Sequence, residues 1–241
     1  MGSIACDDAP SPRAKLDSAP AKSERPPEPT AIKAPAPSGP PELVIDTISP
    51  KVGFERALFQ YPDGRQKLAD ALGQSKGKFG QDVHLAVERK ANPAWVAAYL
   101  NELSKIDVAK VDVHTETRSE FSSQVVFTPE IRAGKPAPCS PVVMILSDRS
   151  TAVWKLGGGV AGRRPKGMAG PDLSMTAETI ERVAKSCKGS ASLFVASAPE
   201  VEWGLVFDLA ASARSLLPGR FDSIVFVSTT PVPGHAIEFG R

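Results

Sequence analysis

The run from Gly157 to Arg164 is the segment of this sequence closest in composition to a phosphate-binding loop, reading Gly-Gly-Gly-Val-Ala-Gly-Arg-Arg. A phosphate loop needs Lys and then Ser or Thr after its last glycine, to reach the phosphates and the metal ion. Arg163 and Arg164 supply neither group, and Pro165 opposes an immediate helix. We therefore expect no nucleotide site here. Arg163, Arg164 and Lys166 either contact an anionic polymer or belong to a solvated loop.

The three histidines show no pattern typical of a metal site or a catalytic site. His84, His114 and His235 lack a Cys, Asp or Glu partner at the ligand spacing of zinc proteins. The sequence contains no Gly-x-Ser-x-Gly nucleophile elbow. The acidic pair Glu200 and Glu202 is better explained by the start of a helix than by acid–base chemistry. We predict a protein that is not an enzyme and that uses no cofactor or metal.

The three cysteines support two separate predictions, one for Cys6 and one for Cys139 and Cys187. Cys6 follows small residues ending in Ala5, which resembles the lipobox at which bacterial lipoproteins are cleaved and acylated. The apolar segment expected before a lipobox is missing, so either the chain begins downstream of it or Cys6 lies in an ordinary tail. Cys139 precedes a predicted strand and Cys187 ends a predicted helix. In an oxidising compartment these two could form a disulfide, and the alternative is two buried free thiols.

Composition limits the classes of protein to which this chain can belong. The chain has 241 residues, of which 41% are hydrophobic and 23% charged, as is typical of globular proteins with one or two domains. A formal net charge of +2, with Lys and Arg dispersed along the chain, argues against nucleic acid as a partner. No apolar run reaches the roughly 18–20 residues of a membrane-spanning helix.

Proline and glycine divide the chain into five segments. Residues 1–41 are rich in proline and predict a disordered, extended spacer. A second proline-rich stretch, residues 118–141, is expected to be a linker, with a candidate short strand over 124–127. We therefore predict a spacer over 1–41, a first domain over 42–117, a linker over 118–141, a second domain over 142–230 and a tail over 231–241.

Hydrophobic periodicity predicts the same order of elements in both domains. In the first, strands over 43–48 and 52–59 precede a helix over 63–74, a strand over 83–87, a helix starting at Asn92-Pro93 and a strand over 110–115. In the second, strands over 142–146 and 151–156 precede a helix over 176–186, a strand over 192–197, a helix over 200–216 and a strand over 223–228. The predicted fold class is α+β, with two tandem ββαβαβ units, each a small mixed sheet with two helices packed on it.

A tryptophan stands at the same place in each repeat. Trp95 follows Val87 by eight positions, and Trp203 follows Val195 by eight positions. Because each lies at the start of a predicted helix, we interpret both as packing anchors between helix and sheet rather than as ligand-stacking aromatics.

This pattern resembles the periplasmic domain of the ExbD/TolR family of biopolymer-transport subunits. The resemblance is clearest in the helix segment Thr176–Val183, the strand Ser192–Ala196, the turn Ala198–Trp203 and the strand Ser223–Thr229. Val83–Thr117 matches the corresponding part of the first repeat. The resemblance covers most of residues 43–230.

The resemblance implies a non-enzymatic cell-envelope protein that acts as a binding or scaffold component of an energy-transduction or envelope-maintenance assembly. Its implied partners are envelope proteins of an ExbB/TolQ-like or TonB/TolA-like system, or peptidoglycan. The implied location is the periplasm, and the lipobox-like residues before Cys6 predict lipid on Cys6 as the membrane anchor. Two copies in one chain would form an internal pseudo-dimer. A homodimer of the whole chain is the alternative or additional assembly. The alternative is a true proton-driven transport subunit whose N-terminal membrane helix is missing from this sequence.

Overall fold

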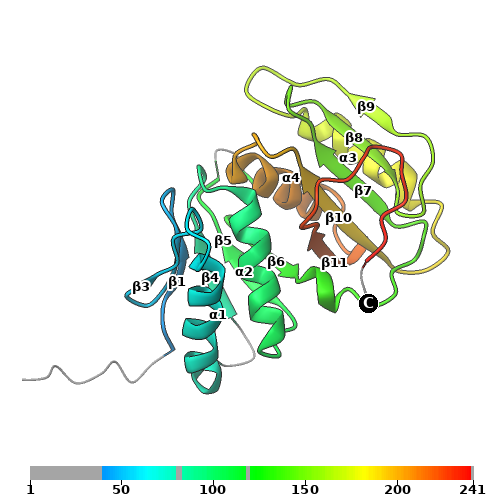
Figure 1. Ribbon diagram of the computed structural model, residues 1–241. Helices are drawn as coiled ribbons and strands as arrows, with labels where there is room; N and C mark the ends of the chain where they lie inside the picture. Colours follow the sequence, from blue (N-terminus) through cyan, green and yellow to red (C-terminus); the bar gives the residue numbers. More distant parts are fainter. Residues whose placement is uncertain (1–39, 80–82, 118–119, 240–241) are drawn as a thin grey trace, which may run out of the picture. The chain divides into compact units, whose positions relative to one another are not determined.

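Eleven strands form one continuous mixed sheet in the computed structural model, which describes residues 40–79, 83–117 and 120–239 (Figure 1). The strand order is β3-β2-β1-β4-β5-β6-β11-β10-β7-β8-β9. The predicted architecture of two tandem units, each with its own small sheet, is therefore wrong. The predicted spacer over 1–41 and its Cys6 lie almost entirely outside the described residues.

The N-terminal half supplies one side of this sheet and two α-helices. Helix α2 begins at the predicted place, where the Asn92 side chain accepts a hydrogen bond from Ala94 N and Pro93 is the first helical residue. The elements are β1 (Leu43–Ile45), β2 (Pro50–Val52), β3 (Glu55–Arg56), α1 (Gly64–Ser75), the 3₁₀ turn η1 (Lys76–Lys78), β4 (Val83–Val87), α2 (Pro93–Lys105) and β5 (Val111–His114).

The C-terminal half supplies the other side of the sheet. Its elements are the 3₁₀ turn η2 (Glu130–Arg132), β7 (Pro141–Ile145), β8 (Thr151–Lys155), β9 (Gly162–Arg164), α3 (Leu173–Ala184), β10 (Ala191–Ser197), α4 (Trp203–Leu216) and β11 (Phe221–Phe226). The order β3-β2-β1-β4-β5 on one side recurs as β9-β8-β7-β10-β11 on the other. The sequence repeat is thus a repeat of strand order within one sheet.

Strand β6 (Gln124–Thr128) joins the two halves. It pairs antiparallel with β5, with Val111 opposite Phe127, and parallel with β11, with Ile224 opposite Phe127. Val125 and Phe127 are fully buried. A central strand needs partners on both edges for its backbone N–H and C=O groups, and β6 finds one in each half. The segment predicted as a linker is therefore a structural element of the sheet.

Helix α4 is capped by the N-terminal half. Its N-cap residue, Glu202, makes no side-chain capping hydrogen bond. Instead, Trp203 N donates to Ala91 O at 3.1 Å and Gly204 N donates to Arg89 O at 2.7 Å. The first N–H groups of a helix have no partner within the helix, so these carbonyls satisfy two of them. A Cβ at Gly204 would approach side-chain atoms of Arg89 to 2.9 Å, which explains glycine at this close contact.

A largely buried ion pair stabilises the same junction. Arg89 donates two hydrogen bonds to the Asp208 carboxylate on α4, at 3.0 and 2.6 Å. Arg89 also donates to Glu116 O at 2.6 Å. The two side chains are only 14% and 12% exposed. The Asp208 hydrogen bonds raise the pKa of Arg89, so the guanidinium stays charged.

Trp203 is a packing anchor, as predicted, but its partners come from both halves. It is fully buried and contacts Phe127, Phe207 and Phe226. Its Nε1–H donates to Thr115 Oγ1 of the N-terminal half at 2.9 Å. Trp95 is only partly buried, and its ring meets Phe59 edge to face. Both tryptophans thus pack against the core, and they differ in that only Trp203 is fully buried.

Among the described residues, none of the helices combines the length and the apolar character that crossing a bilayer requires.

Arg89→Met should destabilise the fold by about 3 kcal/mol, because it leaves the Asp208 carboxylate buried without its partner. The double variant Arg89→Met/Asp208→Leu should recover much of this loss, since removing both charges leaves neither unpaired. Urea unfolding followed by circular dichroism measures both free energies. The control is Lys185→Met, which removes an exposed pair with Glu181 and should change little. If Arg89→Met behaved like this control, the junction would not depend on the pair.

A second carboxylate, Asp46, stabilises the turn between β1 and β2. Its Oδ1 accepts backbone N–H groups of Ile48 and Ser49, each at 2.8 Å, and its Oδ2 pairs with Lys51 and Arg56. Burial alone would raise the pKa of Asp46. The hydrogen bonds from Lys51, Arg56 and the turn outweigh burial and hold this pKa well below its usual range.

Asp46→Asn should therefore lower stability at pH 7 and reduce the loss of stability in acid. A lowered folded-state pKa contributes stability above the unfolded value of about 3.9, and that contribution disappears as pH falls through the folded value. The stability difference between Asp46→Asn and the unsubstituted chain should shrink steadily between about pH 5 and pH 2. Urea unfolding across this range measures it. A constant difference over that range would contradict the assigned role of the carboxylate.

Candidate binding cleft

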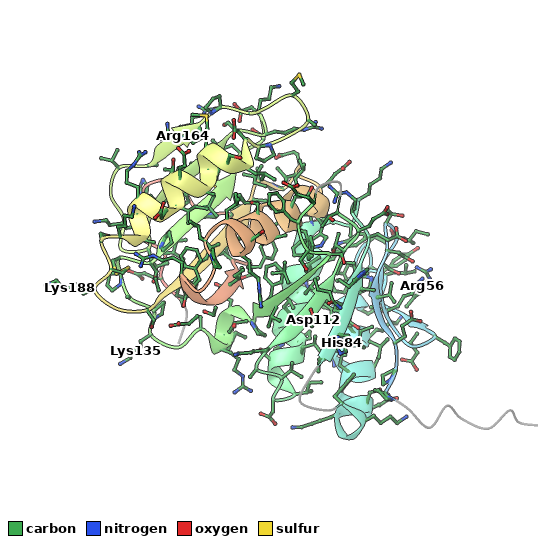
Figure 2. The ribbon with its side chains drawn as sticks, turned by 180° about the vertical axis from the view of Figure 1, so that it is seen from behind. Arg56, His84, Asp112, Lys135, Arg164 and Lys188 are labelled. Atoms are coloured by element: carbon green, nitrogen blue, oxygen red, sulfur yellow. A yellow bond between two sulfur atoms is a disulfide. The ribbon has the colours of Figure 1, made fainter. Side chains whose placement is uncertain are left out.

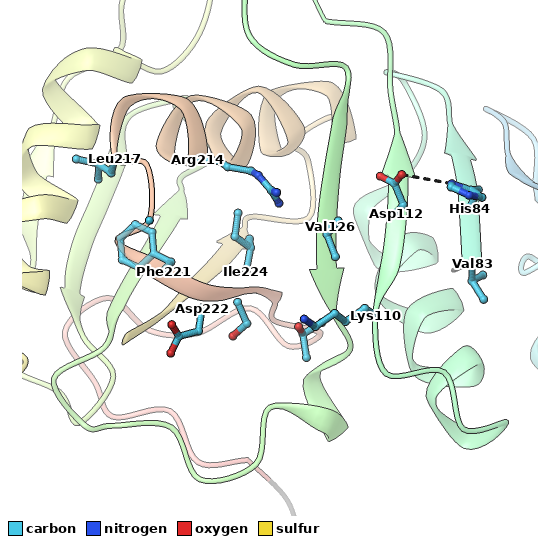
Figure 3. Close-up of a pocket in the computed structure, with 13 residues that line it drawn as sticks. Val83, His84, Lys110, Asp112, Val126, Arg214, Leu217, Phe221, Asp222 and Ile224 are labelled. Atoms are coloured by element: carbon cyan, nitrogen blue, oxygen red, sulfur yellow. Dashed lines mark ion pairs between the residues drawn. The ribbon is translucent and has the colours of Figure 1, made fainter. Parts of the chain in front are cut away.

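A cleft of about 480 Å³ lies where β4, β5 and β6 meet β11 and the C-terminal end of α4 (Figure 3). Its walls therefore come from both halves of the chain and from the strand that joins them. The volume falls in the range typical of small-ligand pockets. The lining residues are Val83, His84, Lys110, Asp112, Val126, Thr128, Arg214, Leu217, Gly219, Phe221, Asp222, Ser223 and Ile224.

Alternation along β4 and β5 explains why polar side chains reach this cleft. Successive side chains of a strand point to opposite faces of the sheet. On β5, Val111 and Val113 are fully buried, so Asp112 between them lies on the other face. His84 on β4 is paired with Asp112 in the parallel register, and Asp112 with Val126 in the antiparallel one. Polar and apolar groups thus share this face at neighbouring strand positions.

His84 and Asp112 contact each other at the cleft. His84 Nδ1 lies 3.3 Å from Asp112 Oδ2 (Figure 3). The His84 side chain is 69% exposed and that of Asp112 is 24% exposed. The imidazole therefore faces solvent at the rim, while the carboxylate lies deeper.

The other oxygen of Asp112 has an unmet hydrogen-bonding requirement. Asp112 Oδ1 is buried, and no partner for it exists among the described residues. A buried polar atom left without a partner costs about 1–3 kcal/mol, so such atoms are uncommon and call for an explanation. In the described part of the chain, Arg220 Nε is the only other buried side-chain polar atom without a hydrogen-bond partner. Arg220 lies in the turn that brings Gly219 and Phe221 to the cleft.

Three further charged side chains line the cleft without making ion pairs. Lys110 just before β5, Arg214 on α4 and Asp222 on β11 are exposed, and within the described residues their charged groups bond to no other side chain. Figure 3 shows Arg214 extending from the helix and Lys110 from the opposite side, with Val126 and Ile224 between them. Cations and carboxylates therefore share one cleft and leave their charges free for a ligand.

The residues singled out from the sequence lie elsewhere. Arg163 and Arg164 belong to strand β9, in the segment expected to be a loop, and are not free. Arg163 Nη2 pairs with Asp148 Oδ2 at 2.6 Å, and Arg164 Nε donates to Thr179 Oγ1 at 2.7 Å. Lys166 is exposed, just beyond β9. Contact of these three residues with an anionic polymer stays a prediction. Figure 2 shows Arg164 well apart from His84 and Asp112.

Cys139 and Cys187 are joined by a disulfide. Their Cα atoms are 5.4 Å apart, a usual separation for such a bond. The bond connects the segment before β7 to the residues that follow α3, across 48 positions of sequence. It lies outside the cleft and is a structural link within the C-terminal half.

The histidines do not form a metal centre in the described part of the chain, where no group of three His, Cys, Asp or Glu side chains could hold a metal ion. His114 is an exposed residue of β5, and His235 contributes its carbonyl oxygen, which accepts a hydrogen bond from Trp154 Nε1 at 2.8 Å. Sequence reasoning placed His84 on a strand but missed its pairing with Asp112. The alternation in the two neighbouring strands was the available signal.

Comparisons with known proteins do not identify this chain. No protein-family model and no curated protein matches it. Two solved structures of the Acinetobacter baumannii Cap4 SAVED/CARF-domain containing receptor show weak similarity. The one with the cyclic trinucleotide 3'3'3'-cAAA is 11% identical, with 71% of this chain and 42% of that chain covered and a TM-score of 0.25. The other is 10% identical, with 77% and 43% covered and a TM-score of 0.22.

The chain thus spans less than half the length of the receptor chains it matches. Similarity at this level assigns no function, and the cleft has to be interpreted from its own residues.

Asp112→Val should raise the free energy of unfolding by about 1 kcal/mol, because it removes the buried oxygen that has no partner and introduces a strand-favouring residue. Urea unfolding of the purified chain measures the change. The control is Asp46→Val, which removes a fully hydrogen-bonded carboxylate and should destabilise. A loss of stability in Asp112→Val as large as that in the control would show that Asp112 is structural.

Proposed function

We propose that this chain is a non-enzymatic binding or scaffold protein of the cell envelope, working outside the reducing cytosol. The observation that carries the location is the disulfide between Cys139 and Cys187. Disulfides persist in oxidising compartments such as the bacterial periplasm and are rare in the cytosol. The order of strands and helices in Val142–Thr229 resembles the periplasmic domain of the ExbD/TolR family. This resemblance supports the same location and membership of an envelope assembly.

The chemistry of the cleft favours binding over catalysis. Covalent catalysis needs a hydroxyl or thiol nucleophile within hydrogen-bonding reach of a base. The imidazole of His84 contacts the Asp112 carboxylate, and no described hydroxyl or thiol group hydrogen bonds to it. Of the hydroxyls lining the cleft, Ser223 Oγ donates to Ser192 Oγ at 2.8 Å. The free charges of the cleft are groups that recognise a ligand.

The envelope location is tested by trapping thiols in the cells that express the chain natively. Cells are lysed into N-ethylmaleimide, and the protein is recovered from periplasmic, membrane and cytosolic fractions. The unsubstituted chain is used, because Cys6 is the predicted anchor, and mass spectrometry of its peptides after denaturation reports alkylation of Cys139 and Cys187 separately from Cys6. We expect recovery in an envelope fraction with both cysteines unmodified until a reductant is added. Recovery in the cytosol with both thiols alkylated would contradict the proposal.

The disulfide should also stabilise the fold. Cys139→Ser/Cys187→Ser should lower the free energy of unfolding by about 3–4 kcal/mol, as expected for a link that closes a loop of this size in the unfolded chain. Denaturation of the oxidised chain with and without reductant should give the same difference as the double variant. Equal stability of the oxidised and reduced forms would contradict a structural role for the bond.

A further inference from the structure

We infer that the cleft binds a short peptide-like ligand carrying both an ammonium group and a carboxylate group. This inference rests on the proposed binding function and specifies the class of ligand. Its basis is the presence, in one cleft, of cations without ion-pair partners and of a part-exposed carboxylate whose inner oxygen has no partner.

The part-exposed carboxylate of Asp112 specifies one end of the ligand. Asp112 Oδ1 can only accept, because an ionised carboxylate has no proton to donate. Rotation of the carboxylate about Cβ–Cγ brings the unpartnered oxygen to the exposed side. An ammonium group then suits it best, since hydrogen bonds between two charged groups are roughly twice as strong as neutral ones. Asp222, which is exposed on β11, adds a second negative charge.

The cations specify the other end. Arg214 presents a planar guanidinium that can bind a carboxylate through two parallel hydrogen bonds, and Lys110 adds a second positive charge. Figure 3 places Arg214 and Lys110 on opposite sides of Val126 and Ile224.

The middle of the cleft suits a short stretch of peptide. Val126, Ile224, Leu217 and Phe221 supply apolar surface between the charged groups. A volume of about 480 Å³ holds a ligand of a few residues and not a folded partner.

Other ligand classes fit this set of charges less well. A polyphosphate or another polyanion would be repelled by Asp112 and Asp222. A neutral sugar could donate to Asp112 but would leave Arg214 and Lys110 without anions. Only a ligand with both charges uses every free group in the cleft.

The test is a titration of the full, oxidised chain with trialanine, which at pH 7 carries one ammonium and one carboxylate. Two matched probes each lack one charge: N-acetyl-trialanine lacks the ammonium, and trialanine amide lacks the carboxylate. Two-dimensional ¹H–¹⁵N NMR spectra report both affinity and location. We expect saturable shifts at Asp112, Arg214 and Ile224, with each blocked peptide binding at least about tenfold more weakly than trialanine.

Two variants identify the groups responsible. Asp112→Asn should lose most of its discrimination between trialanine and the N-acetyl form, because only the exposed Asp222 then supplies negative charge among the residues lining the cleft. Arg214→Gln should lose most of its discrimination against the amide. Lys188→Gln, an exposed lysine elsewhere in the fold, is the matched control and should bind as the unsubstituted chain does. A variant that only perturbed folding would weaken all three peptides alike.

Equal binding of the three peptides by the unsubstituted chain would overturn the inference, as would shifts confined to residues outside the cleft. Binding of inorganic phosphate in preference to trialanine would also overturn it and would assign the cleft to anions. None of these results bears on the envelope location, because thiol trapping and fractionation test that independently.

Discussion

The two backbone hydrogen bonds from Trp203 and Gly204 to the carbonyls of Ala91 and Arg89 are the contact on which the arrangement of the C-terminal half depends. Helix α4 has no capping side chain of its own, so the N-terminal half satisfies its first N–H groups. The Arg89–Asp208 ion pair and the Trp203–Thr115 hydrogen bond fix the same end of the helix. With that end in place, β11 pairs with β6, and the turn after α4 is brought to the cleft.

Strand β6 turns two similar sets of elements into a single protein. Its hydrogen bonds to β5 and to β11 leave no free sheet edge between the halves. The edges that remain, β3 and β9, are short and carry charged residues, which discourages pairing with another chain. The cleft is a consequence of this junction, because its walls come from β4 and β5 on one side and from β11 and α4 on the other. A chain with only one half would lack it.

Local structure could be predicted from the sequence far better than the assembly of its elements. The N-cap at Asn92 and the apolar spacing along α3 and α4 are short-range signals, and the helices form where these signals lie. A short strand over 124–127 was among the expectations, but the prolines that follow it, such as Pro129 and Pro136, indicated a linker, so its pairing with both halves was missed. The composition Gln-Val-Val-Phe-Thr is nevertheless typical of a buried strand, and its burial in the structure reflects this. Partner choice depends on contacts distant in sequence, which a pattern of residues does not specify.

The candidate site could not be predicted from the sequence either, because its residues are brought together by contacts distant in sequence. Asp112 and His84 are 28 positions apart in sequence and meet only through the register of β4 and β5. Arg214 reaches the cleft from a helix of the other half. Arg163 and Arg164, which the sequence made prominent, are used in local contacts with Asp148 and Thr179.

The most direct test of a single sheet across β6 is native-state hydrogen exchange of the backbone amides in β5, β6 and β11. If the two halves form one cooperative unit, these amides open with the same free energy as global unfolding. Exchange of the β6 and β11 amides at a much lower free energy, with β4 and β5 still protected, would contradict a continuous sheet and with it the cleft at the junction.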